Sequence, residues 1–264
     1  MIEFKSVTFA YGEEESPVFN GLDITLPHGM VSLIGQNGTG KSTMLLLAGG
    51  RLLPGSGSVM LNGRDTKEIK DEAERDRYAA FIYQNMEFET EENIGSLLEY
   101  VYKNGYHTSY NNGFIQELIG VFKLGNILKR RTQEISKGEL QRVILAFSLL
   151  YGTPLIMMDE PVFALEEQQK HKALEYIRAY AKQKEISVYF SLHELDLTHK
   201  YSDYMVLFYK DKPPVVDVTP VLFKPEIIEE AYQVPFHMLK DRELLFRTAL
   251  VELDKKRAQR ENSG

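Results

Sequence analysis

The sequence predicts an α/β fold with a mostly parallel sheet at its core, and three observations support this class. Short apolar segments typical of strands alternate with helical segments along most of the chain, as they do where helices connect parallel strands. One strand runs directly into a glycine-rich turn, and a helix follows that turn. A run of helical patterns at about residues 88–152 separates two core strands, which indicates an inserted helical subdomain.

The strands are predicted from short apolar or alternating segments that end at glycine, proline or polar residues. Residues 2–9 alternate apolar and polar side chains, as a half-buried strand does, and residues 57–61 form a strand bounded by glycines. The remaining strands are expected at residues 22–26, 30–34, 79–83, 155–159, 186–191 and 204–208.

Helices are expected between these strands. The first begins at about Lys41, and another covers about residues 168–183. The helical subdomain contains a polar loop at residues 104–113. Short helices are expected after the strand at residues 186–191 and again beyond Pro220.

The C-terminal part is expected to form a small separate unit. Residues 236–239 and 244–247 are predicted to pair as a hairpin that turns at Asp241–Arg242, and the charged last dozen residues are expected to fray. We therefore divide the chain into one domain, residues 1–235, and a hairpin with a charged tail, residues 236–264.

Composition narrows the class of protein. The 264 residues are 43% hydrophobic, which suits a globular domain with or without a small appendage. No apolar run reaches the roughly 18 residues of a membrane span, and the N-terminus lacks a signal-peptide pattern. The absence of cysteine excludes disulfides and thiolate metal sites, and the net charge of −7 disfavours a nucleic-acid partner.

Residues 35–42 read GQNGTGKS, which is the spacing of a phosphate-binding loop between a strand and a helix. Glycines let the backbone curl so that its N–H groups face phosphates, and the helix N-terminus adds positive potential. Lys41 is expected to neutralise the β- and γ-phosphates, and the Ser42 hydroxyl to bind Mg²⁺. The alternative is an ordinary glycine turn, but the strand-to-helix context favours the loop. The residues expected to hold a nucleotide here are Gly35, Gln36, Asn37, Gly38, Thr39, Gly40, Lys41, Ser42 and Thr43.

Two carboxylates follow the apolar strand that begins at Leu155. Asp159 at the strand tip can hold Mg²⁺, and Glu160 can polarise a water for in-line attack on a phosphate. Two acids at the solvated end of a strand can also be merely structural. Beside a phosphate-binding loop, the functional interpretation is the stronger one.

A third motif, ISKGELQR at residues 135–142, is similar to the Leu-Ser-Gly-Gly-Gln/Glu signature, followed by Gln-Arg, of ABC-transporter ATPases. Ser136 and Glu139 also form a capping box, so a helix with an anion-binding N-terminus is expected here. The motif lies ahead of the strand that carries Asp159, as in that family. The chain therefore resembles an ABC-transporter ATPase over about residues 1–235. The resemblance implies a P-loop NTPase (RecA-like) fold, with a mostly parallel core, an antiparallel β subdomain and an inserted helical subdomain.

The resemblance also implies roles for residues that physics alone does not single out. Tyr11 stands where an aromatic ring stacks on adenine, Gln84 where a glutamine touches Mg²⁺ and faces the membrane partner, and His193 where a histidine contacts the γ-phosphate. The expected catalytic residues are Lys41, Gln84, Glu160 and His193; Ser136, Gly138 and Glu139 complete the nucleotide site; and Ser42, Gln84 and Asp159 bind the metal. The implied cofactors are ATP and Mg²⁺.

Members of this family pair head to tail around two ATP molecules, so a second ATPase subunit is an implied partner, most simply a second copy of this chain. Three residues depart from the family pattern: Lys137 replaces a glycine, Phe163 replaces a serine and Glu166 replaces an aspartate. Lys137 can hinder a partner's phosphate, pair with it or point to solvent. We expect tolerance, because the capping geometry leaves Lys137 free.

The order of elements after His193 looks like importer ATPases for iron chelates, cobalamin and metals. The resemblance then implies integral membrane permease subunits as partners and a peripheral cytoplasmic location on the inner face of the cell membrane. A soluble ABC ATPase acting on a soluble scaffold, of the iron–sulfur assembly type, is the alternative. A DNA-associated ABC protein is disfavoured by the acidic charge and by the lack of long coiled coils.

Overall fold

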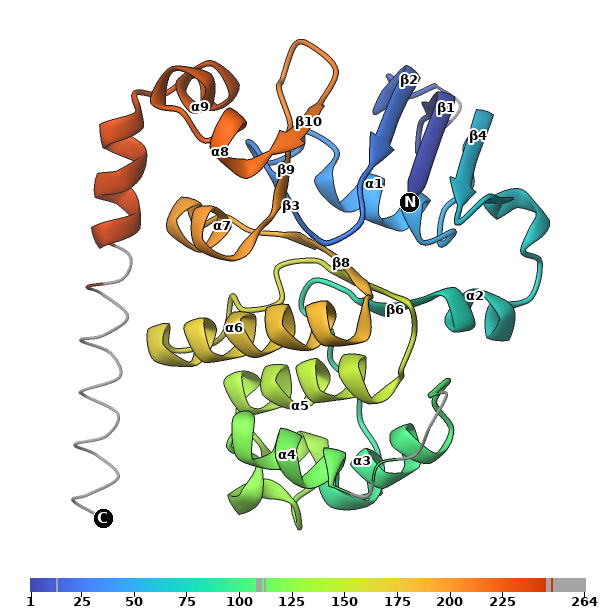
Figure 1. The fold of residues 1–264 in the computed structure, drawn as a ribbon, viewed down its shortest axis with the longest axis vertical. Coiled ribbons are helices and arrows are strands. Elements are labelled where there is room, and N and C mark those ends of the chain that lie inside the picture. Colours follow the sequence, from blue (N-terminus) through green and yellow to red (C-terminus); the bar gives the residue numbers. More distant parts are fainter. Residues whose placement is uncertain (13, 108–110, 112, 246–247, 249–264) are drawn as a thin grey trace.

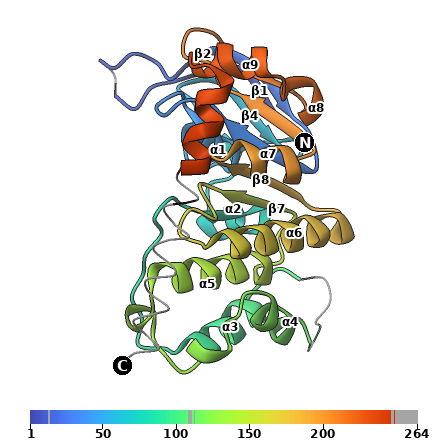
Figure 2. The ribbon, with the colours of Figure 1, turned by 90° about the vertical axis from the view of Figure 1, so that its left-hand side faces the viewer.

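The computed structural model describes the whole chain except residues 13, 108–110, 112, 246–247 and 249–264. Two sheets with the C-terminal helices form one end of the molecule, and stacked helices form the other (Figures 1 and 2). The predicted α/β class is confirmed.

The smaller sheet is antiparallel and has the strand order β2–β1–β4–β5. Phe4 of β1 pairs with Ile24 on one side and Val59 on the other, and all three side chains are buried. Alternation of apolar and polar residues therefore gives this sheet one core-facing side. Its strands are β1 (Ile2–Phe9), β2 (Phe19–Leu26), β4 (Ser56–Leu61) and β5 (Arg64–Asp65).

The larger sheet has the order β10–β9–β3–β8–β7–β6 and is parallel except for β10, which pairs antiparallel with β9. Its central strands are buried throughout, as expected for a parallel sheet covered on both faces. The predicted strands match to within a few residues, and only the short β5 and the edge strand β10 were not predicted. The strands are β3 (Met30–Ile34), β6 (Ala79–Ile82), β7 (Leu155–Met158), β8 (Ser187–Ser191), β9 (Tyr204–Leu207) and β10 (Val215–Val218).

Helices cover both faces of the larger sheet. The helix α1 shares a core with the inner faces of the two sheets, whereas α5 and α6 pack on the opposite face (Figure 1). The predicted polar loop separates α3 from α4, and part of it lies outside the described residues. The helices are α1 (Lys41–Ala48), α2 (Glu72–Tyr78), α3 (Ile94–Lys103), α4 (Phe114–Val121), α5 (Lys137–Leu150), α6 (Glu167–Lys184), α7 (Leu195–Tyr201), α8 (Thr219–Leu222) and α9 (Pro225–Tyr232). None of the described helices is long and apolar enough to cross a membrane.

The predicted C-terminal hairpin is wrong. Residues 236–245 are helical, residues 246–247 of the predicted second strand lie outside the described part, and so does most of the charged tail. The helix starts after Pro235, whose carbonyl accepts the first helical hydrogen bonds. Phe236 and Leu239 are three residues apart, so they share one helix face and pack on the core. That spacing was interpreted as a strand.

Candidate functional site

The phosphate loop begins at the end of β3, which lies between β8 and β9 in the larger sheet. Gly35 and Gly40 have φ angles of 146° and 100°, a region that side chains other than glycine rarely adopt. A Cβ atom at Gly35 would lie 2.7 Å from the carbonyl oxygen of Phe208, and one at Gly40 would lie 2.9 Å from Val18. Both glycines are therefore required by backbone geometry as well as by close packing.

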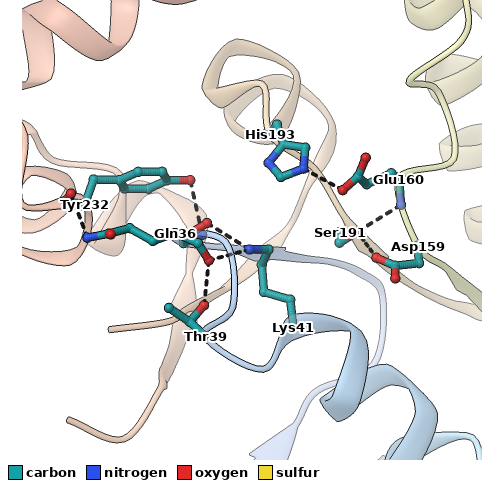
Figure 3. Close-up of polar contacts among 9 residues, drawn as sticks. Gln36, Thr39, Lys41, Asp159, Glu160, Ser191, His193 and Tyr232 are labelled. Carbon is teal, nitrogen blue, oxygen red and sulfur yellow. Dashed lines mark hydrogen bonds and ion pairs between the residues drawn. The ribbon is translucent and has the colours of Figure 1, made fainter. Parts of the chain in front are cut away.

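Lys41 is the first residue of α1, and only 8% of it is exposed. Its ammonium donates hydrogen bonds to the carbonyl oxygens of Gly35 and Gln36, at 2.9 and 2.7 Å, and Thr39 donates to the same Gln36 oxygen at 2.8 Å (Figure 3). Burial lowers the pKa of Lys41, and the charges of Glu160 and Asp159 oppose that shift. The ammonium thus lies inside the loop and faces the two carboxylates.

A second contact to the loop comes from the C-terminal part of the chain. The Gly35 N–H donates to the hydroxyl of Tyr232 at 3.1 Å, and the Gln36 amide donates to the Tyr232 carbonyl at 2.7 Å (Figure 3). Tyr232 ends α9 and was not predicted from the sequence, because nothing in the pattern of a short surface helix indicates a long-range contact.

The two carboxylates follow β7, directly beside β8. The Ser191 hydroxyl, at the end of β8, donates to Asp159 Oδ1 at 2.5 Å and accepts from the Glu160 N–H at 2.9 Å. Glu160 has a φ angle of 51°, which is rare for a residue with a side chain. Ser191 therefore holds a strained turn in place, a role that a serine at a strand end does not reveal in the sequence.

His193 lies after β8, and its Nε2 is 2.5 Å from Glu160 Oε1 (Figure 3). This hydrogen bond is the largest cause of a lowered pKa at Glu160, and the Gln84 side chain and Lys41 act in the same direction against the effect of burial. The structure thus brings together Lys41, Gln84, Asp159, Glu160 and His193, as the sequence predicts.

Three further predicted residues lie at the rim of this group. The Tyr11 hydroxyl is 3.0 Å from the Thr43 hydroxyl, and its ring meets Phe9 edge to face. Tyr11 is 58% exposed, so a face of the ring is accessible to a flat ligand. Ser42 is exposed one residue after Lys41.

The signature motif lies at the start of α5, within the stack of helices (Figures 1 and 2). Its capping box is formed as predicted: Glu139 accepts from the Ser136 N–H at 2.8 Å, and Ser136 accepts from the Glu139 N–H at 3.3 Å. A Cβ atom at Gly138 would lie 2.9 Å from the Ala164 carbonyl oxygen. Among the described residues, no hydrogen bond or ion pair joins this motif to the phosphate loop.

The unusual Lys137 forms an ion pair with Glu87 at 2.9 Å, and its side chain is 84% exposed. Lys137 thus connects the start of α5 to the segment that follows Gln84. The other two departures lie near Glu160: Phe163 is exposed beside a small hollow that Glu160 and His193 also line, and Glu166 precedes α6.

Comparison with known proteins identifies the family. A family model described as "ABC transporter" matches residues 19–163. The chain belongs to the ABC transporter ATPase family. A lipoprotein-releasing system ATP-binding protein LolD from Xanthomonas campestris pv. campestris is 30% identical over 73% of this chain and 83% of its own length. An Fe(3+) ions import ATP-binding protein FbpC from Photorhabdus laumondii is 26% identical over 84% of this chain, which spans 63% of that relative.

Among solved structures, a dimeric ATP-binding cassette bound to ADP and Pi matches 83% of this chain and 99% of its own, with a TM-score of 0.73 and 20% identity. That likeness confirms the ABC ATPase fold. The family membership confirms the prediction of an ATP-binding ABC ATPase subunit. It leaves the direction of transport open, because relatives named for import and for lipoprotein release both match.

Proposed function

We propose that this ABC ATPase binds Mg²⁺-ATP at the edge of the larger sheet where β3, β7 and β8 end, and that its hydrolysis drives import through a membrane permease. The observation that carries the proposal is the convergence of Lys41, Asp159, Glu160 and His193 at one sheet edge. A cation, two carboxylates and an imidazole at the carboxyl ends of parallel strands suit phosphoryl transfer.

The loop fits a triphosphate because its glycines keep side chains away from the curled backbone. The N–H groups at the start of α1 face the same space, with the positive end of the helix dipole behind them. To bind ATP, the Lys41 ammonium exchanges the carbonyl oxygens of Gly35 and Gln36 for phosphate oxygens. The tyrosine ring of Tyr11, near Thr43 at the other side of α1, is placed to stack on the adenine.

The donors near Asp159 fit magnesium. Mg²⁺ prefers oxygen ligands and is usually held by one or two carboxylates together with substrate phosphates. Ser42, Gln84 and Asp159 supply such oxygens, and the described residues contain no cluster of three His, Cys, Asp or Glu side chains that would suit another metal. When bound, the ion neutralises charge that develops on the phosphates.

Glu160 is placed to accept a proton from the attacking water. Its lowered pKa keeps the Glu160 carboxylate ionised at neutral pH, and Oε1 of this carboxylate forms a hydrogen bond with His193 Nε2. His193 is 40% exposed at its side chain, so its ring can reach from Glu160 to a γ-phosphate. Hydrolysis then depends on Glu160 and His193 acting as one unit.

The signature residues are assigned to the partner's ATP. Ser136 and Glu139 cap the start of α5, Gly138 lies between them, and no hydrogen bond or ion pair among the described residues joins them to their own phosphate loop. A second copy of the chain, related by a two-fold axis, supplies the missing side of each site. The segment Gln84–Phe88 is the proposed docking surface for the permease, which places the protein on the cytoplasmic face of the membrane.

The experiment compares the unsubstituted chain with Glu160→Gln. We expect Glu160→Gln to bind ATP with affinity within about threefold and to lose hydrolysis by about 10²–10⁴-fold, because a general base is removed while shape is kept. ATP should hold this variant as a dimer in size-exclusion chromatography. Near-normal turnover contradicts the assignment of Glu160. Failure to co-purify a permease from detergent-solubilised membranes contradicts the transport role and favours a soluble scaffold partner.

A further inference from the structure

Three consecutive residues after His193 are each held by a side chain from outside their own helix. Glu194 accepts from Lys170 of α6, at 2.6 Å. The Leu195 N–H donates to Glu243, and Asp196 pairs with Lys240, both from the helix at residues 236–245. The turn that carries His193 is thus fixed from two sides.

The hydrogen bond from the Leu195 N–H to Glu243 takes the place of a side-chain cap at the start of α7. The helix α7 has only seven residues, and Glu194 at its N-cap position forms no capping hydrogen bond with its side chain. The first N–H groups of a helix need acceptors, and a lost cap costs about 0.5–2 kcal/mol. Glu243 provides this acceptor 48 positions later in the chain. A frayed first turn of α7 leaves His193, two residues before Leu195, held from one side only, by the pair between Lys170 and Glu194.

The helix at residues 236–245 is itself anchored firmly enough to do this. Phe236 and Leu239 pack against a cluster that includes Leu195, two residues after His193, and Ile34, one residue before the phosphate loop. The Phe236 N–H also donates to Glu229 of α9 at 2.7 Å. Figures 1 and 2 show this helix beside α7 and α9, at the start of the C-terminal segment. The helix therefore packs on a cluster that includes residues next to both the phosphate loop and His193.

The other contact to the turn that carries His193 is the buried ion pair between Lys170 and Glu194. Lys170 is 1% exposed and lies in α6, the helix that follows the Glu160 turn. Removing one partner of a buried pair is strongly destabilising, so this contact is difficult to test without unfolding the protein. The Lys240 side chain is 31% exposed and that of Glu243 is 11% exposed, so their helix is a better place to intervene than the almost completely buried Lys170.

We propose that Glu243 and Lys240 are positioning residues for His193, and that the C-terminal helix is thereby part of the hydrolytic apparatus. Capping of α7 by Glu243 keeps the His193 ring at the 2.5 Å contact with Glu160. Neither side chain is among the residues assigned to the nucleotide site. The role rests on the proposed function of Glu160 and His193 in ATP hydrolysis.

The kinetic test uses Glu243→Ala in the full chain. We expect kcat for ATP hydrolysis to fall about five- to tenfold, the rate equivalent of one lost cap, while KM for ATP changes less than about twofold. Glu243→Gln keeps an oxygen that accepts from the Leu195 N–H, so its kcat should stay within about twofold of the unsubstituted value. The matched control is Asp241→Ala, an exposed carboxylate in the same helix, with no expected effect. Lys240→Met removes the ion pairs to Asp196 and Glu243 and the contacts of the ammonium with the rings of Phe223 and Phe236, but it leaves the Glu243 oxygen that caps α7. It should lower kcat by about two- to threefold.

A spectroscopic readout separates positioning from general destabilisation. The chain has six histidines, so the ring signals of His193 can be assigned by comparison with His193→Ala in heteronuclear NMR. In Glu243→Ala these signals should move, whereas those of His28, which lies beside Ser187 at the opposite end of β8 from His193, should not. Unchanged kcat and unchanged His193 signals in folded Glu243→Ala and Lys240→Met overturn the proposal. Absence of ATPase activity in the unsubstituted chain refutes the proposed function instead, and the NMR comparison then still decides whether Glu243 holds His193.

Discussion

The phosphate loop and the start of α5 are both helix N-termini suited to anions, yet they differ in what surrounds them. At the phosphate loop, Lys41 of α1 and Tyr232 of α9 form hydrogen bonds with the backbone of Gly35, the charges of Asp159 and Glu160 act on Lys41, and Lys41 is almost completely buried. At the start of α5, the Ser136 and Glu139 side chains form the two hydrogen bonds of the capping box, and Lys137 is exposed to solvent beside Glu87.

This difference indicates that the two helix N-termini of one chain, at the phosphate loop and at the start of α5, have unequal parts in binding ATP. The capping box uses the Glu139 N–H and leaves other first-turn N–H groups of α5 for an acceptor from elsewhere. The phosphate loop already has its cation and its carboxylates. We infer that the loop sets affinity for ATP, whereas the start of α5 acts only when a second chain brings its own loop to it.

The largest expected effect comes from the loop side. Lys41→Ala should lower ATP hydrolysis by at least about 10²-fold and weaken ATP binding at least about tenfold, because a buried cation that faces the phosphates is lost. Steady-state turnover and nucleotide titration measure the two effects. Lys182→Ala, an exposed lysine of α6, is the control and should behave like the unsubstituted chain. Normal turnover in a folded Lys41→Ala protein would falsify the loop assignment.

Mixing two inactive variants tests whether the half-sites belong to different chains. One protein carries Lys41→Ala with an intact α5 start, and the other carries Ser136→Arg with an intact loop. An equal mixture should recover about a quarter of the unsubstituted activity, because half the dimers are mixed and each has one complete site. No recovery, although the two proteins exchange subunits, would mean that loop and signature act within one chain.

The ion pair between Lys137 and Glu87 gives a smaller effect. Lys137→Gly removes a solvent-exposed pair worth about 0–1 kcal/mol and a cation that opposes the helix dipole. We therefore expect the fold to persist and turnover to change by less than about tenfold. Glu87→Gln is the matched variant from the other side of the pair. Near-complete loss of turnover in Lys137→Gly, with normal turnover in Glu87→Gln, would show that Lys137 binds a partner's phosphate.

The smallest expected effect is on stability. Glu160 has a φ angle of 51°, and a left-handed conformation costs a residue with a Cβ atom about 1–2 kcal/mol. The free energy of unfolding of Glu160→Gly should therefore exceed that of Glu160→Ala by about 1 kcal/mol, measured by denaturant unfolding. Both variants are expected to lack ATP hydrolysis. Equal stability of the two variants would show that the turn relaxes when the glutamate is removed.

The sequence predicted the site best where chemistry and local structure coincide. The strand before Gly35, the strand before Asp159 and the capping box of Ser136 and Glu139 each show a local pattern, and the structure has all three. The positions of Tyr11, Gln84 and His193 came from family resemblance alone. Their roles, like those of the other site residues, remain predictions for the experiments above.

The long-range contacts could not be predicted. Ser191 lies at the end of β8, Tyr232 at the end of α9 and Glu243 in the helix at residues 236–245, and no short-range pattern indicates their long-range contacts. The prediction of a C-terminal hairpin was wrong for a related reason. Phe236 and Leu239 are three residues apart, a spacing that places both on one face of a helix but on opposite faces of a strand, and as a helix they pack together on the cluster that includes Leu195.

The place of β3 in the larger sheet has a consequence for synthesis on the ribosome. The strand is made early, but its neighbours β8 and β9 begin only at Ser187 and Tyr204. In the smaller sheet, β1 pairs with β2 and β4, and these partners lie much closer to β1 in the sequence than β8 and β9 lie to β3. The smaller sheet is therefore expected to form first. A nascent chain that ends before about residue 207 has the sequence GQNGTGKS without the sheet that shapes it. We expect such a chain to be unable to recruit nucleotide, so that ATP can stabilise only nearly finished molecules.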